Sequence, residues 1–129
     1  EALRVNNVEH AYIVHSNDGM DEISPFAKTN VVELNNNIIT EFIIDPKNIG
    51  VEGTNKNNLK GKNALYNSKK IIEIYKGISN EFSEAVSLNV AAGLIVSSKE
   101  FDFKEAFVKA KEHLKSGKVF QHLSKIQLK

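Results

Sequence analysis

The spacing of apolar residues changes near Asn63, and this change constrains the fold more than any other feature of the sequence. Before it, short runs of β-branched and aromatic residues alternate with polar segments that contain glycine or proline, as strands alternate with turns. After it, apolar residues recur at intervals of three and four, as they do on the faces of helices. Strands followed by helices predict part of an α/β layer, in which helices cover a sheet.

The first half of the chain predicts one strand and then a β-hairpin. The three strands are Ala11 to Val14, Thr29 to Leu34, and Ile38 to Ile44. Asn35 to Asn37 forms the hairpin loop, because asparagine tolerates a positive φ. The first strand is expected to join strands that lie upstream, so the chain is expected to be truncated. Asp45 to Gly50 predicts a turn, and Val51 to Lys62 an exposed connection with little to bury.

Three or four helices are predicted after Asn63, which can cap the first of them, and Gly77 can end that helix. Its expected inner face consists of Leu65, Ile71, Ile72 and Tyr75. Asn80 to Ser97 is apolar nearly all round, as in a core helix.

The last helical region is predicted to begin with a capping box formed by Asp102 and Glu105. Its expected inward residues are Phe103, Ala106, Phe107, Ala110 and Leu114. The pair Ser116 and Gly117 is expected to break it before a final helix that ends near Ile126.

Composition limits the possible classes of protein. A chain of 129 residues with 41% hydrophobic and 26% charged residues predicts one packing unit that folds. A net charge of +1 gives no footprint for nucleic acid or an anionic membrane. The chain contains no cysteine, no apolar run long enough to span a bilayer, and no initial segment that resembles a signal peptide. A soluble, cytoplasmic protein is therefore expected.

Three carboxylates, Asp18, Asp21 and Glu22, follow the first strand, where ligands often bind in α/β sheets. Magnesium commonly takes one or two protein carboxylates and completes its shell with water and substrate phosphates. The residues Asp21 and Glu22 are therefore candidate metal ligands. From spacing alone, a solvated acidic turn is the more common interpretation, because acidic residues are frequent in loops.

Other polar residues have structural interpretations. His15 could act as a base or phosphate contact, although a hydrogen-bonded structural histidine is the commoner case. The segment Lys60 to Lys62 could hold an anion at a helix start, but a simple entry turn is favoured. Asn67 and Asn89 interrupt apolar helices and are expected to satisfy backbone groups. Three further histidines are expected on helix ends or faces as structural or solvated groups: His10, His113 and His122.

The string from Val14 to Ser24 resembles the V-H-G-x-D-G-L-D-E-I-S segment of anthranilate phosphoribosyltransferases. The likeness continues in order through Thr29 to Leu34, Asp45 to Gly50, Leu59 to Ala64 with Asn67, Leu88 to Ala92, and Ser116 to Lys118. It implies the carboxy-terminal portion of a catalytic α/β domain of the nucleoside phosphorylase and phosphoribosyltransferase type.

The resemblance also implies a reaction: anthranilate and phosphoribosyl pyrophosphate are joined at the ribosyl C1 and pyrophosphate is released, in tryptophan biosynthesis. It implies Mg²⁺ as cofactor, with Asp21 and Glu22 as metal ligands. It implies a homodimer formed through a helical domain outside this chain. The family's phosphate-binding loop and anthranilate contacts also lie outside it, so the chain alone is expected to be inactive.

Two departures from the family pattern stand out. Ser16 replaces the usual glycine, and Lys62 and Asn63 stand where glycine and aspartate are usual. Two alternatives remain open: a paralogue of the same fold that binds nucleic acid, and a related pyrimidine nucleoside phosphorylase. The balanced charge argues against the first alternative, and the Asp-Glu pair fits the second less well.

Overall fold

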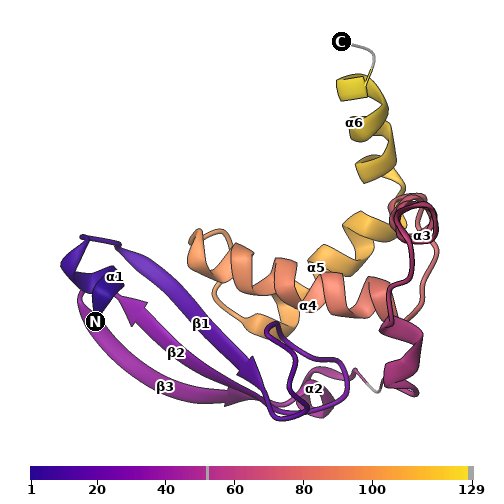
Figure 1. Ribbon diagram of the computed structural model, residues 1–129. Helices are drawn as coiled ribbons and strands as arrows, with labels where there is room; N and C mark the ends of the chain where they lie inside the picture. Colours follow the sequence, from indigo (N-terminus) through magenta and orange to yellow (C-terminus); the bar gives the residue numbers. More distant parts are fainter. Residues whose placement is uncertain (52, 128–129) are drawn as a thin grey trace.

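The computed structural model describes residues 1–51 and 53–127. A three-stranded sheet occupies one side, and helices pack beside one end of it (Figure 1). The elements in chain order are α1 (Ala2–Val5), β1 (His10–Ser16), β2 (Thr29–Asn35), β3 (Ile38–Ile44), α2 (Pro46–Ile49), the 3₁₀ turn η1 (Lys56–Leu59), α3 (Ala64–Tyr75), α4 (Glu81–Val96), α5 (Phe103–Lys115) and α6 (Lys118–Gln127).

The sheet is antiparallel in the order β1-β2-β3. Asn36 and Asn37 have φ values of +48° and +68°, which confirms the predicted asparagine hairpin between β2 and β3. Strand β1 lies at one edge of this sheet, and the expectation that it also joins strands upstream stays a prediction. The strand β1 pairs with β2 along its length, because the loop between them reverses the chain and returns it beside β1.

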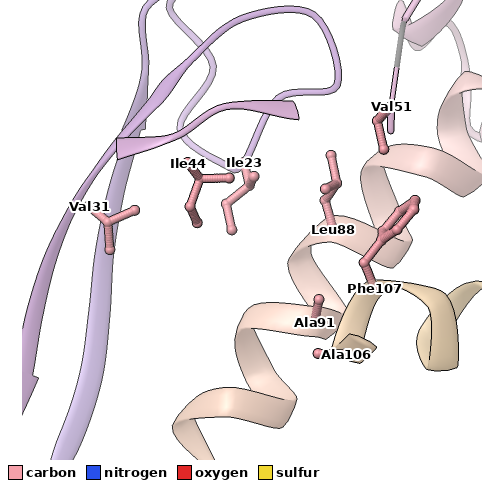
Figure 2. Packing of buried hydrophobic residues seen from close by; sticks show 8 residues of the cluster. All are labelled: Ile23, Val31, Ile44, Val51, Leu88, Ala91, Ala106 and Phe107. Atoms are coloured by element: carbon pink, nitrogen blue, oxygen red, sulfur yellow. The ribbon is translucent and has the colours of Figure 1, made fainter. Parts of the chain in front are cut away.

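One hydrophobic cluster joins the sheet to the helices (Figure 2). Its buried members are Ile23, Val31, Ile44, Val51, Leu88, Ala91, Ala106 and Phe107. Helix α4 packs along α5 and also contacts β1, so it connects α5 to the sheet. The sequence predicts an exposed connection at Val51, but only 3% of the surface of this residue is accessible. It is the apolar residue that follows α2, and it packs beside Phe107 and Leu88.

The ends of α3 are confirmed, but its predicted inner face is right only for Ile72 and Tyr75, which are half-buried. The Asn63 side chain accepts a hydrogen bond from the Tyr66 N–H at 2.9 Å, and Gly77 follows the helix with a φ of +93°. However, Leu65 and Ile71 are 66% and 46% exposed, and Ile74 is the buried residue of the helix. The reason is that α3 contacts α4, α5 and α6 along a narrow stripe, so much of its apolar surface stays uncovered.

Helix α4 begins with a reciprocal capping box between Asn80 and Ser83, which is not among the features predicted from the sequence. It buries one side only, since Val90 remains 46% exposed. In α5, the Asp102 carboxylate accepts a hydrogen bond from the Glu105 N–H at 2.8 Å, which confirms the predicted start. The predicted inward residues are buried or half-buried.

Gly117, with a φ of +72°, separates α5 from α6 and confirms the predicted break. In Figure 1, α6 extends away from the other helices. Within residues 1–51 and 53–127, every helix is too short or too polar to cross a membrane.

Candidate metal site on the loop between the first two strands

The loop of residues 17–28 connects β1 to β2 and begins with a tight turn. The Gly19 N–H donates to the Ser16 carbonyl oxygen at 2.9 Å, and the Ser16 N–H donates to the Met20 carbonyl oxygen at 2.9 Å. Gly19 has a φ of +86°, a conformation that favours glycine. This turn ends the pairing of β1 and places the next two residues, Asp21 and Glu22, on the surface.

The candidate ligands Asp21 and Glu22 are both exposed. Partial burial of the Glu22 carboxyl group raises its pKa, and the negative charge of Asp21 raises it further. The two carboxylates are therefore close enough to repel each other. A divalent cation would relieve that repulsion, and carboxylate oxygens are the ligands that hard cations prefer.

Asp18, the third carboxylate of the loop, has a different role. Its Oδ2 accepts a hydrogen bond from the Ser24 hydroxyl at 3.0 Å and lies 3.4 Å from the Lys56 Nζ. Its Oδ1 accepts a weaker bond from the Met20 N–H at 3.3 Å. Asp18 thus ties the two ends of the acidic segment together and connects them to η1.

The same contacts set the charge of Asp18. Burial by itself would raise the pKa of its carboxyl group, but hydrogen bonds from Ser16, Ser24 and the Met20 N–H, together with the charge of Lys56, outweigh burial and lower it. Asp18 therefore stays ionised as a fixed structural anion. Among the described residues, no group of three or more histidine, aspartate or glutamate side chains could hold a metal ion.

Asn89 on α4 fixes the backbone directly after Glu22. Its Oδ1 accepts a hydrogen bond from the Ile23 N–H at 3.0 Å, and its Nδ2 donates to the Ile23 carbonyl oxygen at 3.1 Å. The same Nδ2 donates to the Ala85 carbonyl oxygen at 2.9 Å. The expectation that Asn89 satisfies backbone groups is confirmed. Its polarity within an apolar helix was the signal, but the sequence did not identify its partner.

The remainder of the loop turns inward. Ile23 and Ser24 are 1% and 0% exposed, and the Ser24 N–H donates to the Thr29 hydroxyl at 3.3 Å. Ser16, the departure from the usual glycine, is also fully buried. Its single hydroxyl proton can serve either the Lys28 carbonyl oxygen, 3.3 Å away, or the Asp18 carboxylate. The added side chain therefore lies inside the loop.

The other polar residues considered from the sequence lie outside the loop that carries Asp21 and Glu22. His15 is exposed on β1. His10 lies on a strand rather than on a helix end, and its Nε2 is 2.8 Å from the Glu33 Oε1. The Asn67 Oδ1 accepts a hydrogen bond from the Lys62 N–H at 2.9 Å, so this amide braces the entry to α3, as expected of a structural residue. Lys56, whose contact with Asp18 matters to the site, carried no signal in the sequence.

Comparisons with known proteins agree with this architecture. Residues 1–120 match the family model described as the glycosyl transferase family, a/b domain. The chain is 46% identical over 126 residues to an anthranilate phosphoribosyltransferase of Pelagibacter ubique, covering 98% of this chain and 38% of that protein. The chain thus spans well under half the length of the curated relatives it matches.

Solved structures of anthranilate phosphoribosyltransferases share the fold of this chain. The anthranilate phosphoribosyltransferase of Thermus thermophilus matches 90% of this chain with a TM-score of 0.81 and 26% identity, over 34% of its own length. The enzyme of Saccharomyces cerevisiae, solved in complex with PRPP and Mg, matches 95% of this chain with a TM-score of 0.82 and 24% identity, over 36% of its own length. The predicted α/β fold and the family resemblance are confirmed.

Proposed function

The chain belongs to the glycosyl transferase family whose a/b domain it matches, and we propose that it forms part of an anthranilate phosphoribosyltransferase. The proposed reaction transfers the phosphoribosyl group from phosphoribosyl pyrophosphate to anthranilate and releases pyrophosphate, a step of tryptophan biosynthesis. The observation that carries the proposal is the 46% identity to a relative of that name, together with the paired carboxylates on a braced loop. The enzyme is proposed to be a cytoplasmic homodimer that does not bind nucleic acid.

The carboxylates of Asp21 and Glu22 are proposed to hold Mg²⁺. The donor set fits: both are oxygen ligands on the surface, and partial burial, followed by the negative charge of Asp21, raises the pKa of Glu22. Two protein ligands suffice for magnesium when water and substrate phosphates complete its shell. When bound, the ion would neutralise charge that develops on the departing pyrophosphate.

The residues around the pair do the positioning. Asn89 fixes the backbone that follows Glu22, and Asp18 closes the turn that precedes Asp21. Because these hydrogen bonds already fix the loop, no binding energy is needed to order it when its ligands bind. This favours a reaction that depends on the alignment of its reactants. The saccharomycete enzyme, which shares this fold, was solved with PRPP and Mg, and this supports the choice of metal.

The metal proposal is tested by a double substitution, Asp21→Asn with Glu22→Gln, in the enzyme that contains this chain. We expect pyrophosphate release from phosphoribosyl pyrophosphate and anthranilate to fall on the order of 100-fold at saturating Mg²⁺. Glu41→Gln, an exposed carboxylate on β3, is the matched control and should leave the rate unchanged.

Calorimetric titration with Mn²⁺ gives a second readout that does not depend on turnover. Heat of binding should disappear in the double variant and persist in the control. Full activity in the double variant would refute the metal role. If the unsubstituted enzyme released no pyrophosphate with anthranilate under any divalent cation, the proposed reaction itself would be wrong.

A further inference from the structure

A concave surface that the acidic pair does not line lies between η1 and the first turns of α3 and α4. Its volume is about 410 Å³. Three lysines line it: Lys60 from the segment after η1, Lys62 just before α3, and Lys70 within α3. We call this surface the lysine pocket. Neither Asp21 nor Glu22 is among its lining residues.

The ring of Tyr66 organises two of these ammonium groups. The Lys62 Nζ lies 4.9 Å from the ring centroid, and the Lys70 Nζ lies 5.7 Å from it. Cation–π attraction at such distances favours positions close to the ring. The ring therefore keeps two positive charges beside the pocket. Lys70 also pairs with Glu73 at 2.7 Å, whereas Lys60 and Lys62 form no ion pair with any carboxylate of the described residues.

The one acidic residue that lines the lysine pocket, Glu81, is already engaged by neutral donors. Its Oε1 accepts hydrogen bonds from the Thr54 hydroxyl at 2.7 Å and from the Asn58 Nδ2 at 2.9 Å. These bonds lower the pKa of Glu81, and the bond from Thr54 has the larger effect. They also hold the carboxylate beside Thr54 and Asn58. Three lysines against one carboxylate leave the lining with an excess of positive charge.

We propose that the lysine pocket binds a phosphate-bearing anion. The ammonium group of lysine is a compact charge with three donors and is a common ligand of phosphate. A single exposed ion pair contributes little, but a concave surface lets several lysines reach one multivalent anion at once. The Asn57 amide, which also lines the pocket, adds a neutral donor. The site requires no metal ion.

The test is a titration of the chain with inorganic pyrophosphate in the presence of EDTA, followed by amide chemical shifts. EDTA removes the divalent cations that could bring pyrophosphate to the acidic pair. We expect shifts at the backbone amides of Lys62 to Tyr66. The double variant Lys60→Ala with Lys62→Ala should bind about tenfold more weakly, as for the loss of two exposed ion pairs. Affinity should also fall as salt increases.

Lys69→Ala is the matched control, because Lys69 is exposed on α3 but does not line the pocket. It should bind like the unsubstituted chain. Adenosine 5′-monophosphate forms a second arm: tighter binding than pyrophosphate would assign the Tyr66 ring to an organic group that carries the phosphate. The absence of shifts at these amides with either anion, or equal affinities in the double variant and the control, would overturn the proposal. Circular dichroism verifies that the variants fold.

Discussion

The side-chain amide of Asn89 binds both backbone polar groups of Ile23. The Ile23 nitrogen lies 3.0 Å from the Asn89 Oδ1, and the Asn89 Nδ2 lies 3.1 Å from the Ile23 carbonyl oxygen. One amide thus replaces the strand partner that this stretch of backbone lacks. Because Ile23 directly follows Glu22, the position of the acidic pair depends on a residue of α4. This dependence can be measured.

Substitution of Asn89 by alanine should lower the free energy of unfolding by about 1–3 kcal/mol, because it leaves two polar groups of Ile23 without partners. It should also weaken Mn²⁺ binding at the acidic pair. Urea denaturation and calorimetric titration measure the two effects. Asn67→Ala is the control, since Asn67 binds the Lys62 N–H outside the loop, and it should affect stability without changing metal affinity. Unchanged metal affinity in Asn89→Ala would disprove the coupling.

Two glycines should differ in their tolerance of a methyl group. A Cβ at Gly53 would meet the Phe26 ring and would lie 2.9 Å from the Pro25 carbonyl oxygen, whereas a Cβ at Gly19 meets nothing within 4 Å. Gly53→Ala should therefore cost about 1–3 kcal/mol through overpacking. Gly19→Ala should cost about 1 kcal/mol through its positive φ alone. Denaturant midpoints of the two variants, compared at constant m-value, test this order.

Asp18 should contribute to the acid dependence of stability. Its pKa in the folded protein is lowered, so its contribution is fully present above the ordinary value of 3.8 and is lost as the pH falls through the folded-state pKa. The difference in stability between the unsubstituted chain and Asp18→Asn should therefore shrink as the pH drops below 3.8. Denaturation at a series of pH values measures it. Ser16→Gly should raise the pKa of Asp18, as followed by carboxyl ¹³C shifts; a fall would contradict the proposed bond.

Leu88 should be the most sensitive large apolar residue of α4. It is fully buried in the core cluster, and truncation to alanine should cost about 2–5 kcal/mol. Val90 on the same helix is 46% exposed, and Val90→Ala should cost less than about 1 kcal/mol. Equal destabilisation by the two substitutions would mean that α4 is covered on the side of Val90 as well.

Local features of the fold could be read from the sequence because their causes are local. Asn63 caps α3, Gly77 ends it, and the asparagine pair turns the hairpin, each through the conformation or bonds of neighbouring residues. The inner face of α3 could not be derived in this way. Its several apolar residues are compatible with more than one face, and only the positions of α4, α5 and α6 determine that Ile74 is buried rather than Leu65.

The candidate site shows the same division. The acidic string and its place after a strand were visible in the sequence, and so was the family it resembles. The separate role of Asp18 was not, because it depends on Lys56 and Ser24, which the turn brings to it. The contact between Ile23 and Asn89 spans 66 residues, and no local pattern reports such a pairing. The metal assignment to Asp21 and Glu22 stays a prediction until the double variant is measured.

The hairpin of β2 and β3 closes over two residues, whereas the Ile23 to Asn89 contact needs a loop of 66 residues to close. Loop closure costs more entropy as the loop lengthens, so short-range pairings form first in most small domains. We therefore expect the hairpin to appear early in folding and the acidic loop to acquire its shape only when α4 docks. During refolding, cation affinity would then be gained last. Its appearance would therefore mark the formation of the fully folded chain.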